Sequence, residues 1–496
     1  MTTTRRQFLK ASFFPVATAL SGVSLASPVK TPEKWDHECD MLIIGAGGGG
    51  LAGAIIARTE GLETIVLEKT TFPGGSTLIC GGAWSVCGTD MQKERNIHDS
   101  PERFLEDMLK TGQHRNDPEL VKAMIASSQE MFEFARSKIK VSFSDVTAAS
   151  GMSLPRAHRF VPSDLIKLYF EYAKKVGAQF LFRTKAERLF WDAENERIIG
   201  VRATNAEGKA ITIHAKKGVL IASGGFSRNP ALLQKYNPLM ASVDAEGGIG
   251  NTGDGMLMAQ AYGADTLDMQ YIKATFGYRP DPKKYGPDTL HGYYAGAILV
   301  NDAGKRFVDE SISYKLLSDA ALQQPEAKVF EFFDEALRVE MRDASPKYKR
   351  LLSPMDGNGE TDYCFRGNTI EEVAQKAGID PKTLKETVER YNQFAENGRD
   401  DDFGRTSLTS GYGKLVKFET GPFFLYAARP RLIATYCGIR IDPKARVIDV
   451  FGEPIPNLYA CGEVVGGVHG AAYMTGTAVA KAMAFGRIAA LEIARS

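Results

Sequence analysis

The chain has 496 residues, with 61 lysines and arginines against 60 aspartates and glutamates, so its formal net charge at pH 7 is +1. This balance gives no general footprint for binding nucleic acid or another polyanion. The hydrophobic content of 44% supplies enough apolar material for packed cores, which excludes a globally disordered chain. The length suits two to three domains, or one large domain with an insertion.

The first residues have the pattern of an export signal. The segment 4–10 (TRRQFLK) contains a twin arginine, a mildly apolar run follows over 11–26, and small residues stand at the end of this run. We therefore expect a Tat signal peptide over 1–26 and a mature protein in the periplasm. The alternative, a membrane anchor, fits poorly because the run is short and rich in Ser, Thr and Gly, and no other segment reaches ~18 apolar residues. No stable membrane span is expected.

A strand, a glycine turn, a helix and a second strand follow each other from residue 39. The strands are expected at 39–44 and 64–67, with the helix at 51–59. Between them, Gly45, Gly47 and Gly50 form the G-x-G-x-x-G fingerprint, in which the glycines allow a tight turn, close approach to a pyrophosphate and close helix packing. Glu68 ends the second strand, where a carboxylate can bond ribose hydroxyls. This βαβ unit predicts a dinucleotide-binding domain. A second match at 248–253 follows no strand, so no separate nicotinamide domain is expected.

The rest of the chain suggests an interrupted first domain. Helical periodicity dominates 100–140 and strand patterns occupy 178–224, whereas 266–415 has Tyr-, Pro- and Lys-rich loops before a charged helical segment. Strand patterns return from 416, and a helix of small residues is expected at 475–494. We predict an α/β fold: a Rossmann-like parallel-sheet domain (38–265 and 416–496) interrupted by an α+β capping and substrate domain (266–415).

Further glycine-rich segments favour FAD as the dinucleotide. After Glu68 the chain continues with PGGST at 73–77 and a glycine pair at 81–82, and near its end a short strand closes on Gly462-Glu463 before a helix that begins near Gly476. FAD needs a groove that tracks the cofactor to its ring, and a helix N-terminus there can stabilise negative charge on the reduced flavin. The six Cys and seven His have no metal-ligand or haem-attachment spacing, so no metal is expected.

These motifs together resemble the flavoprotein of the fumarate reductase and succinate dehydrogenase family, including periplasmic flavocytochrome c-type reductases and 3-ketosteroid dehydrogenases. The resemblance covers about 38–494 and includes GAGGGG (45–50), ASGGFSRN (222–229), LVNDAGKRFVDE (299–310) and LYACGEVVGGVHGAAYMTG (458–476). It implies non-covalent FAD, a capping domain, and FAD contacts from Gly45, Gly47, Gly49, Gly50, Glu68, Lys69, Ser76, Thr77, Gly81, Gly82, Ala186, Asp254, Glu463, Ala478 and Val479.

The chain departs from the family where fumarate reductases hold a dicarboxylate with arginines. Tyr314 stands at the position of the proton-donating arginine, Tyr473 at a carboxylate-binding arginine, and Tyr293 near another. A dicarboxylate needs paired, desolvated cations, so fumarate and succinate are poor candidates. The tyrosines are similar to those of ketosteroid dehydrogenases, which implies that Tyr314, Tyr473 and Thr475 are catalytic and that Tyr293 and Gly476 bind substrate. The alternative is that the tyrosines only pack.

These observations predict an exported FAD-dependent oxidoreductase that reduces a C=C bond conjugated to a carbonyl, an enone or enoate. Hydride would come from flavin N5 and the proton from a tyrosine, with electrons from a c-type cytochrome or similar carrier, as in anaerobic respiration. The first alternative is a 3-ketosteroid dehydrogenase that works in the oxidative direction. The second is a non-catalytic FAD-binding electron relay.

Overall fold

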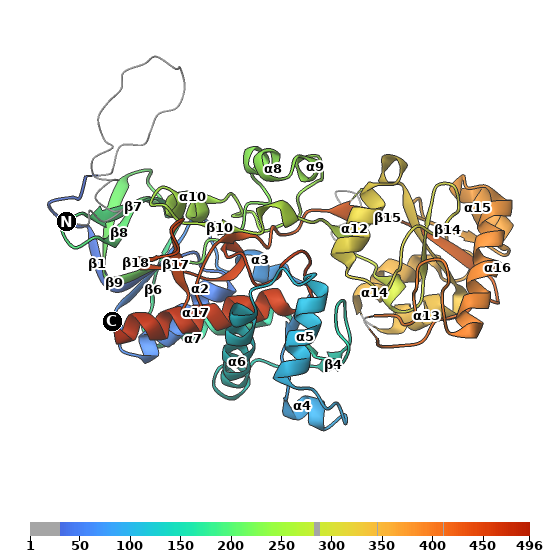
Figure 1. Ribbon diagram of the computed structural model, residues 1–496, viewed down its shortest axis with the longest axis horizontal. Helices are drawn as coiled ribbons and strands as arrows, with labels where there is room; N and C mark the ends of the chain where they lie inside the picture. The colour runs from blue at the N-terminus through green and yellow to red at the C-terminus, as the bar shows by residue number, and fades with distance from the viewer. Residues whose placement is uncertain (1–29, 282–287, 345, 410) are drawn as a thin grey trace, which may run out of the picture.

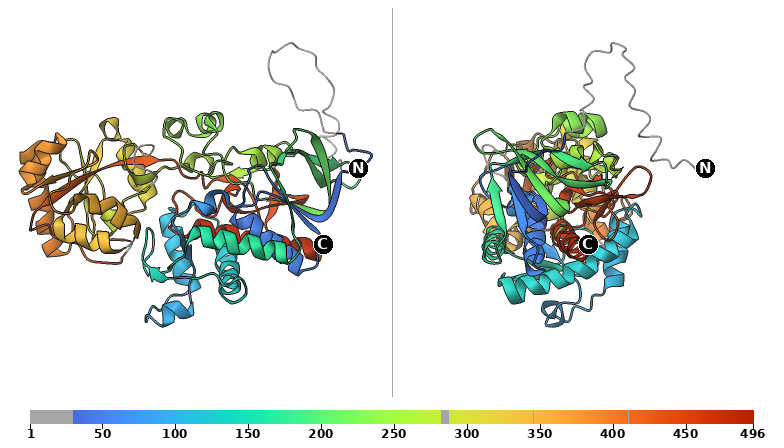
Figure 2. Two further views of the ribbon diagram at one scale, coloured as in Figure 1. Left: turned by 180° about the vertical axis from the view of Figure 1, so that it is seen from behind. Right: turned by 90° about the vertical axis from the view of Figure 1, so that its left-hand side faces the viewer.

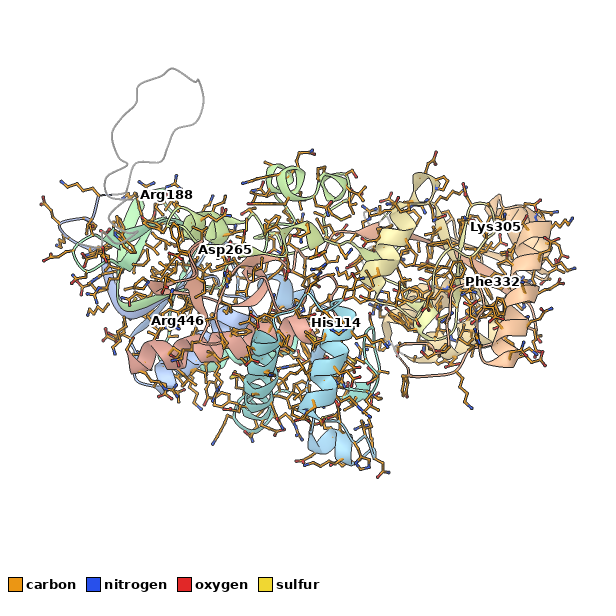
Figure 3. The ribbon with its side chains drawn as sticks, viewed as in Figure 1. His114, Arg188, Asp265, Lys305, Phe332 and Arg446 are labelled. Atoms are coloured by element: carbon orange, nitrogen blue, oxygen red, sulfur yellow. The ribbon has the colours of Figure 1, made fainter. Side chains whose placement is uncertain are left out.

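Two lobes lie side by side along the long axis of the molecule, and both views agree on their separation (Figure 1, Figure 2). The computed structural model describes residues 30–281, 288–344, 346–409 and 411–496. The expected export signal at 1–26 lies outside these described residues. Figure 3 places Asp265 and Arg446 in the first lobe and Lys305 and Phe332 in the second.

A largely parallel sheet forms the centre of the first lobe. Its strand order is β17-β18-β9-β1-β2-β6, and β8 and β7 continue from β9. Strand β2 is buried along its whole length because helices cover the sheet on its faces, which explains its unbroken apolar run. The observed α/β fold with a parallel sheet confirms the predicted fold class. The strands are β1 (His37–Ile44), β2 (Thr64–Glu68), β6 (Gln179–Phe182), β7 (Lys185–Asp192), β8 (Arg197–Thr204), β9 (Ala210–Ile221), β17 (Arg446–Ile448) and β18 (Pro454–Ala460).

The first and last helices of this lobe pack directly on each other. A Cβ added to Gly486 of α17 would lie 2.3 Å from the carbonyl oxygen of Gly49 in α2, so only glycine permits this approach. Within the described ranges no helix combines the length and apolarity needed to cross a bilayer. The helices are α2 (Gly48–Thr59), α3 (Gly75–Leu78), α4 (Asp90–Lys93), α5 (Pro101–Thr111), α6 (Pro118–Phe134), α7 (Pro162–Lys175), α8 (Pro230–Tyr236), α9 (Pro238–Ala241), α10 (Asp254–Gln260) and α17 (Thr477–Arg495).

A small antiparallel sheet, β3 (Ala83–Ser85), β5 (Ala157–Arg159) and β4 (Asp145–Thr147), lies at the end of the first lobe that faces the second. A fully buried arginine anchors it: Arg156 donates to Asp99 at 2.8 Å and also pairs with Asp107 of α5. A buried arginine with both carboxylates satisfied is costly to break. This cluster therefore fixes the position of β5 relative to the helices.

The second lobe is an antiparallel sheet with its own hydrophobic core. The order is β11-β15-β13-β12, with β14 also paired to β15. Figure 1 shows its helices on the outer side and around the sheet. The strands are β11 (Thr275–Tyr278), β12 (Ile298–Asn301), β13 (Val329–Asp334), β14 (Cys364–Gly367) and β15 (Phe423–Arg431), and the helices are α12 (Tyr314–Leu322), α13 (Glu335–Ala344), α14 (Pro346–Leu352), α15 (Ile370–Ala377) and α16 (Pro381–Asn397).

The second lobe ends later than the sequence predicts. Strand β15 lies beyond the expected boundary at 415, yet it pairs with β11, β13 and β14. Before β11 and after β15, the strands β10 (Thr266–Leu267) and β16 (Gly438–Ile439) pair with each other. We therefore place the inserted lobe at 275–431 and not at 266–415. An apolar strand has the same sequence pattern in either sheet, so periodicity alone could not assign β15 to its lobe.

Candidate active site

A cavity of about 920 Å3 extends from the glycine turn of the first lobe to the inserted lobe. Most of the residues expected to bind cofactor or substrate line it, although they come from distant parts of the sequence. Gly50, Gly82 and Tyr293 do not line it. The expected residues that do are Gly45, Gly47, Gly49, Glu68, Lys69, Ser76, Thr77, Gly81, Ala186, Asp254, Tyr314, Glu463, Tyr473, Thr475, Gly476, Ala478 and Val479.

The glycine turn leaves the first turn of α2 open towards the cavity. Gly45 has φ +110°, and a Cβ there would lie 2.4 Å from the carbonyl oxygen of Ala222. The helix begins after Gly47 with no side-chain cap, and Gly48 N donates only a 3.3 Å bond to Thr77 Oγ1. Free backbone N–H groups and the positive end of the helix dipole make this point suited to a pyrophosphate.

Two glycines expected to contact the cofactor allow close packing of the backbone. A Cβ on Gly50 would lie 1.9 Å from the carbonyl oxygen of Gly45, so this glycine allows α2 to pack on the turn. Gly82 has φ +65°, and a Cβ there would lie 2.3 Å from the carbonyl oxygen of Phe160. Neither residue lines the cavity, so a contact of either with the cofactor stays a prediction.

Charged residues surround the cavity at the ends of β2 and α10. Glu68 is held in place by Ala46 N at 3.0 Å and by Thr70 N at 2.8 Å. Lys69 Nζ lies 2.5 Å from Asp254. Burial alone would raise the pKa of Asp254, but the hydrogen bond and charge of Lys69 lower it overall. A fixed carboxylate at the end of the second strand suits the ribose hydroxyls of an adenosine.

Glu463 lies in the middle of the cavity, where it links both halves of the first domain. Its carboxylate accepts from Ser76 Oγ at 3.1 Å, from Asn251 Nδ2 at 3.1 Å and from Thr435 N at 3.1 Å. Burial raises its pKa, although these hydrogen bonds oppose the shift. Next to this network, the buried hydroxyl of Ser223 has no hydrogen-bond partner among the described residues. The open helix end, the glycine-lined walls and this unsatisfied polar atom fit a bound dinucleotide such as FAD.

Tyrosines from both lobes meet at the far end of the cavity. Tyr314 is the first residue of α12, and its ring lies 6.1 Å from that of Tyr473. The N-cap of α12 joins the two segments directly, since Ser313 Oγ donates to the backbone oxygen of Tyr473 at 2.9 Å. The side chain of Thr475 lies close enough to the Tyr314 hydroxyl to lower its pKa, against the larger effect of burial. The site is therefore complete only with both lobes in place.

The two phenols are neutral at physiological pH. Burial raises the pKa of Tyr314 and of Tyr473 above the ordinary tyrosine value. The Tyr473 oxygen accepts from Gly476 N at 2.8 Å, just before α17. Because that oxygen already accepts a backbone bond, its proton is available to a ligand in the cavity. A neutral phenol can donate a proton or a hydrogen bond to a carbonyl compound.

Tyr293 does not line the cavity, whereas the neighbouring Tyr294 does. Tyr293 is fully buried and packs on Phe276, with 5.8 Å between ring centroids. Tyr294 lines the cavity and donates to Ile312 O at 3.0 Å. Both residues belong to one short turn, where adjacent side chains point in different directions. The sequence marked this turn but not which of its tyrosines faces the site.

Sequence reasoning missed two further aromatic residues. Tyr436 stacks on Tyr473 with 4.5 Å between ring centroids and 13° between planes, and His291 stacks on Tyr314 at 5.4 Å. Burial lowers the pKa of His291 well below its ordinary value, so this imidazole is neutral. Neither residue belongs to the segments that carry the family resemblance, so no motif marked either of them.

Comparison with known proteins agrees with this geometry. The chain is 31% identical over 461 residues to a fumarate reductase (cytochrome) of Shewanella frigidimarina, covering 92% of this chain and 77% of that protein. It is 30% identical over 463 residues to an NADH:fumarate oxidoreductase of Klebsiella pneumoniae, of which it spans about half, 48%. The solved structure of a 3-ketosteroid-Δ4-(5α)-dehydrogenase from Rhodococcus jostii RHA1 superposes with TM-score 0.77 at 25% identity, covering 95% of this chain and 99% of that one.

The matched family model fixes the cofactor class. It is described as FAD binding domain and matches residues 40–479, which include the glycine turn, the inserted lobe and the start of α17. The chain therefore belongs to the FAD binding domain family and is an FAD-dependent oxidoreductase of the group that includes the fumarate reductase flavoproteins and the 3-ketosteroid dehydrogenases.

Proposed function

We propose that this protein reduces a C=C bond conjugated to a carbonyl group, in an enone or enoate that is not a simple dicarboxylate. The observation that carries the proposal is the meeting of Tyr314 and Tyr473, from different lobes, in the cavity lined by the glycine turn. When bound, FAD supplies the hydride that the β-carbon receives.

The side chains of this site divide the remaining work. Tyr314 donates the proton that the α-carbon needs, and its neutral, buried hydroxyl carries that proton at physiological pH. Tyr473 and Thr475 donate hydrogen bonds to the carbonyl oxygen, where negative charge develops in the transition state. Closure of the two lobes keeps water away from the reacting carbons.

A small dicarboxylate is a poor match for this site. Tyr473 stands where the family has a carboxylate-binding arginine and Tyr314 where it has the proton-donating arginine, and both tyrosines are neutral. A carboxylate placed against Tyr314 or Tyr473 would lack a charged partner there, which costs several kcal/mol. Although relatives are named for fumarate, the residues at this site favour a substrate with fewer charges and an aromatic or polycyclic body that stacks on Tyr436.

The alternative function is the same chemistry run backwards, as a 3-ketosteroid dehydrogenase. The likeness to the Rhodococcus jostii dehydrogenase favours this alternative. The direction depends on the flavin potential and the redox partner, neither of which the side chains determine. Reduction is preferred because the twin-arginine pattern and the relationship to a cytochrome-named reductase favour an exported enzyme fed by a c-type cytochrome or similar carrier.

An anaerobic reoxidation experiment tests both directions. The purified holoprotein is reduced with a viologen donor and mixed with a 3-keto-4-ene steroid, a cinnamate-type acid, urocanate and fumarate, while flavin absorbance is recorded. Reoxidation by an enone or aryl enoate but not by fumarate supports the proposal. Fast reoxidation by fumarate contradicts the substrate argument. Bleaching of the oxidised holoprotein by a saturated ketosteroid supports the alternative, and no response to any compound favours the electron-relay role.

The predicted export has its own test. Replacing Arg5 and Arg6 by lysine should keep the full-length protein in the cytoplasm, whereas the unchanged protein should reach the periplasm and lose its first 26 residues. Cell fractionation followed by mass spectrometry of the N-terminus measures both results. Periplasmic accumulation of the double-lysine variant would contradict Tat export.

A further inference from the structure

Four of the six cations that line the cavity have no carboxylate partner within 4 Å among the described residues, and two of these four do not bind a backbone carbonyl either. Among the others, Lys69 and Lys185 share Asp254, at 2.5 and 3.6 Å, and two donate to backbone carbonyls of the first domain. Arg159 and Lys347 form no ion pair within 4 Å with any described residue. The cations on the cavity wall are Lys69, Arg159, Lys185, Arg228, Lys347 and Lys481.

We propose that Arg159 and Lys347 together bind one anionic group, a carboxylate, of the ligand that fills the tyrosine end of the cavity. The proposal rests on the proposed function and narrows it: the substrate is an organic monoanion and neither a neutral steroid nor a dicarboxylate. The two residues come from opposite lobes, β5 and α14, so the bound carboxylate would lie between the lobes.

Arg159 is available for such a contact. It ends β5, and its Nε donates to Thr147 Oγ1 at 2.8 Å, which orients the guanidinium. Its two terminal nitrogens form no hydrogen bond with any described residue. Asp145, the carboxylate that influences it, is exposed and already pairs with Arg95 at 3.1 Å. An oriented guanidinium with both terminal nitrogens free suits a bidentate carboxylate.

Lys347 faces the same space from the inserted lobe. Its Nζ donates to the hydroxyl of Thr289 at 3.2 Å. Of the two nearby carboxyl groups, Asp288 pairs with Arg350 at 3.2 Å, and Glu331 is fully buried, where burial raises its pKa well above the ordinary value and keeps it neutral. Neither of them fully neutralises the lysine.

Both cations lie beside the tyrosine end of the cavity. Thr289, which binds Lys347, lies two residues before His291, whose ring stacks on Tyr314. Arg159 pairs with Ala83 of β3, and Ser85 of the same strand donates to the backbone oxygen of Thr475.

The charges of both cations add to the burial that lowers the pKa of His291, and the charge of Arg159 partly opposes the burial that raises the pKa of Tyr348 and of Tyr473. Burial lowers the pKa of Lys347 to about 8, opposed by the charge of Asp288 and helped by that of Arg159, so the amine is still protonated at pH 7. Two like charges held close together in a buried site repel each other, and a bound anion removes that repulsion.

The test measures equilibrium binding to oxidised holoprotein, so it does not depend on turnover. The probes are 3-phenylpropanoate and its neutral amide, followed through changes in flavin absorbance. We expect the acid to bind at least ~10-fold more tightly than the amide. Replacement R159Q or K347M should weaken binding of the acid by about 10- to 100-fold and leave binding of the amide unchanged, since a charge-assisted hydrogen bond has about this strength.

The helix α14 offers a matched control. Lys349 lies on the same helix, is exposed and does not line the cavity, so K349M should leave binding of the acid unchanged. All variants must retain the flavin spectrum and melting temperature of the unchanged protein. For turnover, R159Q should lower kcat/KM for an aryl acrylate by about 10- to 100-fold, because the carboxylate also carries the charge that develops in the transition state, and should leave kcat/KM for its methyl ester unchanged.

The outcomes separate this inference from the proposed function. If acid and amide bind equally well, or if R159Q and K347M weaken both alike, the anion site is wrong even when enones reoxidise the flavin. If the acid binds through these two residues but no compound reoxidises the flavin, the anion site stands and the proposed reaction is wrong.

Discussion

The strongest prediction concerns the hydroxyl of Tyr314. Replacing Tyr314 by phenylalanine removes one oxygen and leaves the ring stacked on His291, 5.4 Å away. The change removes at most one hydrogen bond of the hydroxyl, with Thr475 as its neighbour, and such a bond contributes about 1 kcal/mol to stability. FAD should therefore remain bound and the melting temperature should shift by only a few degrees.

Turnover should respond far more strongly than stability. If Tyr314 is the proton donor, its loss removes general acid catalysis, which contributes about 10²- to 10⁴-fold, equivalent to about 3–5 kcal/mol of barrier. The assay is stopped-flow reoxidation of anaerobically reduced holoprotein by the best enone or enoate of the panel, with FAD content determined from absorbance in the same sample.

Tyr293 provides a matched control from a turn of the same lobe. Its side chain is fully buried away from the cavity, and its hydroxyl has no hydrogen-bond partner among the described residues. The variant Y293F should keep full turnover and equal or higher stability, because it removes an unsatisfied buried oxygen. A rate for Y314F within about threefold of the unchanged protein would refute the role of Tyr314 as the proton donor.

Three further predictions concern the scaffold. Gly50→Ala should abolish FAD retention on purification, because its Cβ would lie 1.9 Å from the Gly45 carbonyl oxygen. Gly61→Ala should retain FAD, because its Cβ meets no atom within 4 Å. Equal FAD content in the two variants would contradict this prediction. Arg156→Met should lower the free energy of unfolding by about 3–5 kcal/mol in urea titrations because two buried carboxylates lose their partner, and a loss below about 1 kcal/mol would be inconsistent with that anchor. Burial lowers the pKa of His158 to about 4, so below about pH 6.5 the unfolded chain binds a proton that the folded chain does not. His158 should therefore account for about 2 kcal/mol of the stability lost between pH 7 and 5. An equally steep loss in H158Q would exclude this cause.

The parts of the fold that the sequence predicts are those with a strong local pattern. The βαβ unit at 37–68 shows it best: a continuous apolar run, glycines at fixed spacing and a carboxylate at the second strand end have only one common structural solution. The final helix is similar, since its small residues match the close approach to α2. These elements form the cofactor half of the cavity, which is therefore the more predictable half.

The other half depends on contacts between lobes, which local patterns do not encode. The resemblance pointed to Tyr314 and Tyr473, and the structure places them together. It could not choose between Tyr293 and Tyr294, because the face of a short turn is set by what packs beneath it. Lys347 has no motif at all, and only the tertiary structure brings it to the cavity.

The strand order of the first lobe also governs when the flavin site can form during synthesis. Strand β18 lies between β17 and β9, but the segment 222–453, which includes the whole inserted lobe, must leave the ribosome before β18 appears. At ~5–20 residues per second this takes roughly 10–50 s. Through that interval the nascent first lobe exposes the edge of β9, and the later α17 has not yet covered α2. The inserted lobe can thus fold before the domain that contains it, and FAD can be captured only after the last residues of the chain have been made.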